Sequence, residues 1–312
     1  MRRLLFVKTS SLGDVVHNCP AVSDAACAWP DAAIDWVVEE AFADVAAMHT
    51  KVQRVIPVAV RRWRGALFSA RTWREMGAFW RALREQHYDR VIDTQGLLKS
   101  ALLARAARGE RHGMDAASVR EPLAARFYDV RHPIAKGQHA VERNRQLVAA
   151  ALGMPPMTDC DYGLRTHGAP PIELPARYAV LLTMTSRADK LWPEEQWVEL
   201  GRCLGKEGVR AVLPWGSEEE RARAARIAAG VRDAVVPRRM SVAELARVLG
   251  GAQGVAGVDT GLTHLAAALG VPAVGIYLST QARLTGLHAG ARARNLEAPD
   301  ATAAYAALAG LA

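Results

Sequence analysis

The fold class of this chain follows from its first stretch, Leu4-Leu5-Phe6-Val7-Lys8-Thr9-Ser10-Ser11-Leu12-Gly13-Asp14. Residues 4–7 are an uninterrupted apolar run, which is typical of a strand buried on both faces of a sheet. Residues 8–14 are mostly polar, and residues 15–29 then repeat apolar positions at helical spacing up to Pro30. This succession of strand, loop and helix predicts the first unit of a parallel α/β sheet.

The same alternation of short apolar runs and helical patterns continues along the chain in two blocks. The first block predicts strands at 34–38, 52–58 and 90–93 and helices at 73–86 and 98–107. The second block predicts strands at 178–183, 209–213, 234–236, 254–258 and 273–277, and helices at 193–206, 218–229, 241–249, 262–269 and 301–311. Strands that alternate with helices favour parallel sheets that are covered on both faces.

A proline-rich stretch between Gly153 and Pro175 separates the two blocks. A length of 312 residues also fits two domains better than one. We therefore expect two doubly wound domains around a cleft, with an amino-terminal domain at 1–155, a linker at 156–176, a carboxyl-terminal domain at 177–300 and a closing helix at 301–312. In open sheets of this kind, ligands bind at the carboxyl ends of the strands.

The composition is that of an ordinary globular protein and excludes several other classes. Hydrophobic residues make up 50% of the chain and charged residues 23%, which does not fit disorder, collagen or a coiled coil. Four cysteines without a C-x-x-C pair are too sparse for a disulfide framework and favour a reducing cytosol. No signal-peptide hydrophobic run follows the first three residues, and the uncharged stretch 260–282 is interrupted by His264 and Pro272, so we expect neither export nor a membrane span.

The net charge of +8 is concentrated in one segment. Residues 51–145 contain 20 Lys and Arg against 9 Asp and Glu, a local charge of +11, and the other 217 residues sum to −3. Such a segment is either a solvated face that aids solubility or an attractive surface for nucleic acid or anionic membrane headgroups. Because it lacks a recognisable nucleic-acid reading module and interleaved exposed aromatics, we expect no nucleic-acid partner and favour the membrane headgroup.

Two loops that follow predicted strands carry candidate chemical groups. In loop 8–14, Asp14 stands at the start of a helix, where a carboxylate either caps the helix or acts as a general base. In loop 183–193, hydroxyl groups and Lys190 precede a helix with Pro193 near its first turn. This loop is either an anion site beside a helix N-terminus or a solvated loop with a surface lysine.

Two further loops have the same position between a strand and a helix. In residues 258–264, Asp259 and Thr260 can cap the helix, His264 can be simply packed, and the backbone N–H groups of the turn can hold a diphosphate. In residues 214–220, an acidic first turn suits the helix dipole, so solvated capping explains its glutamates. The sequence contains no P-loop, G-x-G-x-x-G fingerprint, zinc-ligand spacing or Ser-His-Asp order, and we expect no metal and no cofactor.

Seven segments, taken in order, resemble the lipopolysaccharide heptosyltransferases, and the resemblance spans nearly the whole chain. They are VKTSSLGDVVH at 7–17, DWVVEE at 35–40, VIPVAVRRWR at 55–64, IDTQGLLKS at 92–100, HAVER at 139–143, DKLWPEE at 189–195 and DTGLTH at 259–264. Each segment alone is a weak match, whereas seven in one order are highly specific. The resemblance implies glycosyltransferase family 9 and a GT-B fold, an α/β architecture in which two Rossmann-like doubly wound domains face each other across a cleft.

The resemblance also implies a reaction, in which L-glycero-D-manno-heptose moves from ADP-heptose to the first Kdo of Kdo-lipid A, with inversion and without a metal. An aspartate matching Asp14 acts as the base. Residues that match the donor-binding positions are Thr185, Ser186, Lys190, Glu218, Met240, Asp259, Thr260, Gly261 and His264. Lys190 and the amides of the 260–261 turn would offset the charge of the departing diphosphate. Glu218 would accept from the adenosine ribose, and Asp259 from the heptose hydroxyls.

The acceptor is expected to bind the positively charged amino-terminal domain. Arginine suits its phosphates and carboxylates because the planar fork of the guanidinium pairs two oxygens at once. The candidate acceptor residues are Ser10, Arg61, Arg62, Arg64, Arg120 and Arg143. We expect a monomer that lies peripherally on the cytoplasmic face of the inner membrane and meets its anionic surface through this segment.

Two departures from the family pattern leave details open. Family members commonly continue the last strand into a Tyr-Gly-Pro-Thr-like turn, whereas this chain has Leu278-Ser279-Thr280 after Tyr277, so we assign this loop no role. The alignment is gapped around Glu218, which makes Glu219 the alternative ribose partner. Three rival functions stay open: the family's second heptosyltransferase, which adds the next heptose, a GT-B-shaped sugar-nucleotide epimerase, and a non-enzymatic nucleotide-sugar binder.

Overall fold

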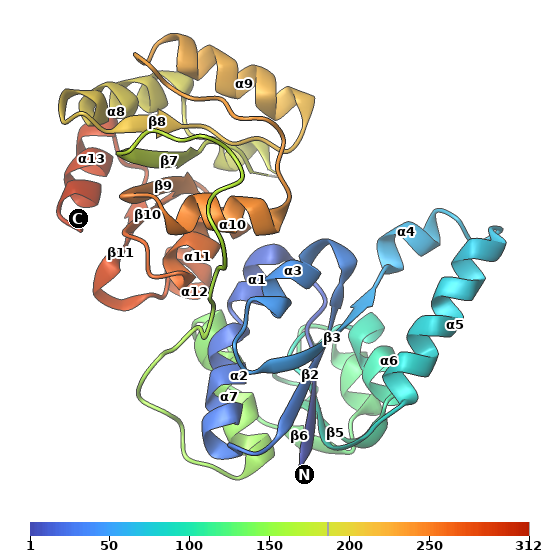
Figure 1. Cartoon of the computed structure of the whole chain (residues 1–312). Helices are drawn as coiled ribbons and strands as arrows, with labels where there is room; N and C mark the ends of the chain where they lie inside the picture. The colour runs from blue at the N-terminus through green and yellow to red at the C-terminus, as the bar shows by residue number, and fades with distance from the viewer. Residues whose placement is uncertain (186, 312) are drawn as a thin grey trace. The chain divides into compact units, whose positions relative to one another are not determined.

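A computed structural model describes residues 1–185 and 187–311, and it divides into two units, Met1–Leu164 and Arg165–Ala312 (Figure 1). Each unit is built on one parallel sheet, which confirms the α/β class and the two sheets expected from the sequence. The division falls inside the stretch 156–176 that the sequence suggests as a linker. Within residues 1–185 and 187–311, no helix is long and apolar enough to cross a membrane.

Unit 1 contains a six-stranded sheet with the strand order β3-β2-β1-β4-β5-β6. Its strands are β1 (Arg3–Val7), β2 (Ala33–Glu39), β3 (Val52–Val58), β4 (His87–Asp93), β5 (Arg108–Met114) and β6 (Val130–His132). Its helices are α1 (Leu12–Val16), α2 (Cys19–Ala28), α3 (Ala43–Ala47), α4 (Val60–Arg64), α5 (Ala70–Arg84), α6 (Leu98–Ala106) and α7 (Ala140–Leu152), with 3₁₀ turns η1 (Glu40–Phe42) and η2 (Pro122–Phe127). Figure 1 shows α2 and α7 together on one side of this sheet and α5 and α6 on the other.

Unit 2 contains a five-stranded sheet with the strand order β11-β10-β9-β7-β8. Its strands are β7 (Tyr178–Leu182), β8 (Arg210–Val212), β9 (Gly254–Val258), β10 (Ala273–Tyr277) and β11 (Ala293–Glu297). Its helices are α8 (Glu194–Lys206), α9 (Glu218–Ala229), α10 (Val242–Gly250), α11 (Gly261–Ala268), α12 (Ala282–Thr285) and α13 (Ala301–Ala309), with 3₁₀ turns η3 (Ala188–Lys190) and η4 (Gly290–Arg292). The closing helix α13 packs on α8 and on the sheet, so it is part of the core of this unit.

The strand order creates a switch point in each sheet. In unit 1 the chain builds outward from β1 through β2 to β3 and then returns to place β4 on the other side of β1. In unit 2 it places β8 on one side of β7 and β9 on the other. The loops that leave the two neighbouring strands therefore turn to opposite faces, and sheets of this kind bind ligands at such a switch point.

Two predicted elements differ from the structure, and three strands and the helices α3, α4, α7 and α12 were not predicted. The predicted strand at 234–236 forms only a single parallel bridge, between Val235 and Val212 at the sheet edge. The predicted helix at 15–29 is two helices, because Pro20 lacks the N–H that would continue the first and instead starts the second. Strands β5, β6 and β11 were missed because they are charged, short or at an edge, and so lack an apolar run.

The core of unit 2 is organised by two buried tryptophans. The Trp192 and Trp197 rings meet edge to face with their centroids 4.8 Å apart, and neither side chain is exposed to solvent beyond 1%. Trp192 Nε1 also donates to the Pro299 carbonyl at 2.9 Å. Since Trp192 ends the loop that follows β7, this packing fixes that loop against the sheet.

Close packing at the end of β5 gives a test of the unit 1 core. A Cβ on Gly113 would lie 2.2 Å from Tyr128 Cε2, and the Tyr128 hydroxyl donates to Asp93 Oδ2 at 2.8 Å. We expect Gly113→Ala to lower the free energy of unfolding by about 1–3 kcal/mol, because the added methyl group pushes the Tyr128 ring away from the Asp93 carboxylate. Urea unfolding followed by circular dichroism measures this loss.

The matched control is Gly77→Ala in α5 of the same unit. A Cβ there has only the flexible Arg81 guanidinium nearby, at 3.6 Å, and its backbone is helical. This substitution should stabilise the protein by about 0.4–1 kcal/mol through the lost freedom of the unfolded chain. Equal effects of the two substitutions would contradict the packing argument.

Candidate functional site

The first candidate site of unit 1 lies where β1 and β4 end side by side, since Val7 pairs with Asp93 in register. Gln95 Oε1 accepts hydrogen bonds from the backbone N–H groups of Thr9 and Ser10, both at 3.0 Å. Lys8 Nζ donates to the Thr94 carbonyl at 2.9 Å. The loop after β1 is therefore fixed to the loop after β4 by side chains that both loops supply.

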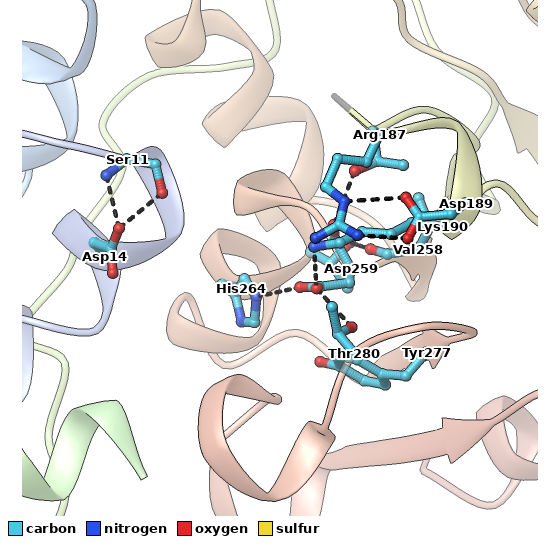
Figure 2. Close-up of polar contacts among 12 residues, drawn as sticks. Ser11, Asp14, Arg187, Asp189, Lys190, Val258, Asp259, His264, Tyr277 and Thr280 are labelled. Carbon is cyan, nitrogen blue, oxygen red and sulfur yellow. Dashed lines mark hydrogen bonds and ion pairs between the residues drawn. The ribbon is translucent and has the colours of Figure 1, made fainter. Parts of the chain in front are cut away.

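Asp14 lies in the first turn of α1, half-buried at the end of this fixed loop. Its Oδ2 accepts from the Ser11 backbone N–H at 2.8 Å and from the Ser11 hydroxyl at 2.9 Å (Figure 2). Asp14 Oδ1 has no hydrogen bond to any other residue in the described part of the chain. Asp14 therefore closes a capping box as its N3 residue, while the N-cap of α1 is Ser11 and not Asp14 as the sequence suggested.

Charges of both signs, that of Asp14 among them, act on Lys8 within unit 1. Burial lowers the pKa of Lys8, the charges of Asp14 and Asp93 oppose that change, and those of Arg143 and Arg120 reinforce it. These five groups therefore share one electrostatic neighbourhood at the carboxyl ends of the strands. The expected acceptor residues Arg120 and Arg143 lie in it with Asp14, although the sequence separates them by more than 100 positions.

The other expected acceptor residues of this site are engaged to different degrees. Ser10 Oγ accepts from Lys99 Nζ at 3.3 Å and is buried. The Arg143 guanidinium donates to the carbonyls of Ser118 at 2.6 Å and Ala135 at 3.2 Å, and burial lowers its pKa. Arg120 is exposed. Arg143 therefore ties down the segment just before Arg120, and Arg120 is the arginine that faces solvent.

Three further arginines lie on the short helix α4, and the structure separates their roles. Arg62 pairs through Nε and Nη2 with both oxygens of Glu40 at 2.9 Å, and through Nη1 with Glu75 at 2.6 Å. Arg61 and Arg64 are exposed, and neither guanidinium forms an ion pair with a carboxylate of the described residues. Arg62 thus holds α4 in place, whereas Arg61 and Arg64 present positive charge to solvent.

The candidate site of unit 2 is organised around Asp259, which follows β9 directly (Figure 2). Its Oδ2 accepts from Lys190 Nζ at 2.7 Å and from the Thr280 hydroxyl at 2.8 Å, and His264 Nε2 lies 3.4 Å from Oδ1. The Thr185 hydroxyl donates to the Asp259 carbonyl at 3.1 Å. Two loops that are distant in sequence, 183–193 and the one after Tyr277, thus converge on the segment that contains Asp259 and His264.

The electrostatics of Asp259 make it a permanent negative charge. Burial alone would raise the pKa of the Asp259 carboxyl, but the hydrogen bonds from His264, Lys190 and Thr280 outweigh burial and hold the pKa well below its ordinary value. The Lys190 and Asp259 side chains are only 16% and 10% exposed. The Asp259 carboxylate thus orients the Lys190 ammonium, which stays partly exposed and can still bind an anion.

Thr280 is a site residue that the sequence analysis missed, because the loop after Tyr277 departs from the family pattern. Its contact with Asp259 depends on the neighbouring positions of β9 and β10, which tertiary structure alone provides. Polar residues directly after a buried strand were the signal that could have identified it.

The remaining expected donor residues lie around the same end of the sheet or on adjoining loops. Thr260 is the N-cap of α11 and Gly261 its first residue, and Met240 is buried before α10. Glu218 is exposed at the start of α9, where its Oε2 accepts from Arg221 at 3.1 Å, and Glu219 is exposed beside it. Ser186 lies outside the described residues. No group of three or more His, Cys, Asp or Glu side chains among residues 1–185 and 187–311 is arranged to hold a metal ion.

Comparisons with known proteins identify the family of this chain. The family described as glycosyltransferase family 9 (heptosyltransferase) matches residues 76–304. The chain is 51% identical over 287 residues to lipopolysaccharide heptosyltransferase 1 of Escherichia coli K12, and the match covers 91% of this chain and 90% of that protein.

Solved structures of heptosyltransferases align with nearly the whole chain. The E. coli heptosyltransferase WaaC with ADP aligns with a TM-score of 0.92 and 46% identity, covering 99% of this chain and 100% of that one. WaaC with ADP-2-deoxy-2-fluoro heptose aligns with a TM-score of 0.82 and 47% identity, covering 96% and 94%. The chain therefore belongs to glycosyltransferase family 9, the heptosyltransferases, and has the GT-B fold.

Proposed function

We propose that this heptosyltransferase moves L-glycero-D-manno-heptose from ADP-heptose to the first Kdo of Kdo-lipid A, with inversion at the anomeric carbon. The observation that carries the donor half is the convergence of Lys190, His264 and Thr280 on Asp259 at the switch point of unit 2. The relative with 51% identity is a lipopolysaccharide heptosyltransferase 1, and a solved relative holds ADP-2-deoxy-2-fluoro heptose. Both support a nucleotide-heptose donor and a lipopolysaccharide acceptor.

The donor would bind unit 2 through its diphosphate and its two sugars. Lys190 would offset the charge that develops on the diphosphate as it leaves, and the backbone N–H groups at the start of α11 would add to that effect. Because Asp259 already fixes the Lys190 ammonium, no reorganisation is required when that charge appears. Thr185, Ser186, Met240 and His264 would line the donor, and Glu218, or in its place Glu219, would accept from the ribose.

The acceptor would bind unit 1, with Asp14 as its general base. Oδ1 of Asp14 would take the proton of the Kdo hydroxyl while the hydroxyl oxygen attacks the anomeric carbon, on the side opposite the departing diphosphate. The hydrogen bonds from Ser11 to Oδ2 keep the carboxylate in one orientation. The exposed guanidiniums of Arg61, Arg64 and Arg120 would meet the phosphates and carboxylates of the acceptor.

The membrane surface is the second partner that we propose for unit 1. A local charge of +11 across residues 51–145 attracts anionic headgroups, and the acceptor itself is lipid-linked. We therefore propose a peripheral position on the cytoplasmic face of the inner membrane.

One assay separates this function from its rivals: the release of ADP from ADP-heptose with Kdo-lipid A and, in parallel, with the heptosylated acceptor. We expect ADP to be released with Kdo-lipid A and not with the heptosylated acceptor. Preference for the heptosylated acceptor would instead identify the second heptosyltransferase. A free epimerised sugar nucleotide would identify an epimerase, and donor binding without ADP release in either mixture would identify a binding protein.

Asp14→Asn tests the base without removing the helix cap. The amide oxygen of asparagine can still accept from Ser11, whereas it cannot take a proton at neutral pH. We expect kcat to fall on the order of 100- to 10,000-fold, with the Kd for ADP-heptose within a few-fold of the wild type. Turnover above about a tenth of the wild-type rate would leave Asp14 as a helix cap only.

Lys190→Ala tests the diphosphate contact. Loss of a charged hydrogen-bond donor should weaken ADP-heptose binding roughly 10- to 100-fold and slow transfer as well, because the charge serves the diphosphate before and during its departure. Calorimetry with ADP-heptose measures the binding. Lys206→Ala, at an exposed lysine of the same unit, is the control, and equal affinities of the two variants would exclude this role.

The double substitution of Arg61→Ala with Arg64→Ala tests the acceptor surface. These two guanidiniums face solvent, so their loss should raise the acceptor KM roughly five- to thirtyfold and leave the ADP-heptose KM nearly unchanged. Raising the salt from 0.1 M to 1 M should act in the same direction, because it shortens the Debye length from about 10 Å to about 3 Å.

Steady-state kinetics with detergent-solubilised Kdo-lipid A measures both constants. Arg232→Ala, at a 91% exposed arginine of unit 2, is the matched control. Equal changes in both KM values would mean that the arginines only make the protein more soluble.

A further inference from the structure

The loop between α4 and α5 exposes three large apolar side chains within seven positions. Leu67 is 48% exposed, Phe68 106% and Trp73 61%. The expectation that the basic segment 51–145 has no exposed aromatics among its charges was therefore wrong. We name these three residues the apolar tip. Figure 1 draws the connection between α4 and α5 at the outer edge of unit 1, away from its sheet. A fully exposed phenylalanine forgoes the free energy of its burial, so a cluster of this kind marks a contact surface.

The three exposed side chains of the apolar tip lie on a turn that hydrogen bonds hold in place. Trp73 Nε1 donates to the Leu67 carbonyl at 2.8 Å, which holds the indole across the loop. The Ser69 backbone N–H donates to Ala66 at 3.0 Å, and the Trp73 N–H donates to Ser69 at 3.3 Å as α5 begins. The turn therefore presents the apolar tip in one defined arrangement.

The base of the loop is anchored to the core of unit 1. Trp63 is buried at 8% exposure, and its ring meets Phe79 edge to face with centroids 5.8 Å apart. Glu75 accepts from Arg71, Arg62 and Trp63, and these donors lower its pKa to about 2. The carboxylate that joins α4 to α5 thus stays charged and keeps the two helices together at any pH near neutrality.

The surroundings of the apolar tip are strongly positive. Residues 61–74 contain five arginines and no Asp or Glu: Arg61, Arg62, Arg64, Arg71 and Arg74. Arg62 and Arg71 are paired with Glu75, while Arg61, Arg64 and Arg74 form no ion pair within the described residues. An apolar centre with a cationic rim complements an anionic bilayer, where aromatic rings settle at the headgroup level and guanidiniums bind lipid phosphates.

We propose that the apolar tip inserts into the boundary between headgroups and acyl chains of an anionic bilayer, while the surrounding arginines bind the lipid phosphates. The inference deepens the proposed function and rests on it, because an enzyme with a lipid-linked acceptor must work at such a surface. A second copy of this chain is a poorer occupant, since a self-complementary contact would bring the two arginine rims against each other.

The test uses the full chain and vesicles of phosphatidylglycerol mixed with phosphatidylcholine. Phe68→Ser should lower the partition coefficient about tenfold, because it removes the most exposed apolar ring. Thermal unfolding of this variant should match the wild type, since Phe68 is fully exposed. Leu102→Ser, at a side chain that is 48% exposed on α6, is the matched control and should bind vesicles as the wild type does.

Insertion depth is measured with brominated lipids, which quench tryptophan fluorescence. The wild type should be quenched by bromine near the headgroups, and Trp73→Phe should lose most of that quenching. Vesicle binding of Phe68→Ser within twofold of the wild type, or an equal loss for Leu102→Ser, would overturn the proposal. Concentration-dependent dimerisation that Phe68→Ser abolishes would also overturn it and assign the apolar tip to self-association.

The proposal and the proposed function fail in distinguishable ways. ADP release with detergent-solubilised Kdo-lipid A needs no bilayer, so Phe68→Ser should retain it. If the wild type releases no ADP but inserts into vesicles, the transfer reaction is wrong and the membrane contact stands. If ADP release is normal and vesicle binding does not depend on Phe68, the proposed membrane insertion is wrong and the proposed transfer reaction is retained.

Discussion

Parallel pairing of the strands is the constraint on which both candidate sites depend. All strand pairs that the structure describes in the two sheets are parallel, so every strand of a sheet ends at the same edge. The first strand of each unit pairs with one strand on each side: β1 lies between β2 and β4, and β7 lies between β8 and β9. Loops 8–14 and 94–100 therefore meet in unit 1, as loops 183–190 and 259–264 do in unit 2.

Each unit has an aspartate at or directly after the end of a strand that pairs with its first strand, Asp93 in unit 1 and Asp259 in unit 2, and their pKa values shift in opposite directions. Asp93 ends β4 and accepts from Tyr128, Ser100 and two backbone N–H groups, all of them neutral donors. Burial wins there, and the pKa of Asp93 is raised. Asp259 follows β9, and the hydrogen bonds from His264, Lys190 and Thr280 lower its pKa despite its burial.

The two carboxyls therefore have different electrostatic surroundings. Asp93 accepts hydrogen bonds from the loop after β4 and from the Tyr128 hydroxyl, and so fixes both. Asp259 remains an anion and orients a cation, which preorganises positive charge beside the first turn of α11. The donors that reach each carboxyl, together with its burial, thus decide the direction in which its pKa shifts.

The sequence alone determined the parallel α/β class, the two units and most of the strands, because apolar runs alternate with helical periodicity. It also placed the polar loops after the strands, and with them Asp14, Lys190, Asp259 and His264. Only the tertiary structure decided the rest, because ion pairs between distant segments leave no local pattern. It paired Arg62 with Glu40 and Glu75 and so left Arg61 and Arg64 facing solvent. It brought Thr280 to Asp259 across neighbouring strands, and it exposed Phe68 on a turn whose sequence, rich in arginine and aromatic residues, equally fits a buried helix end.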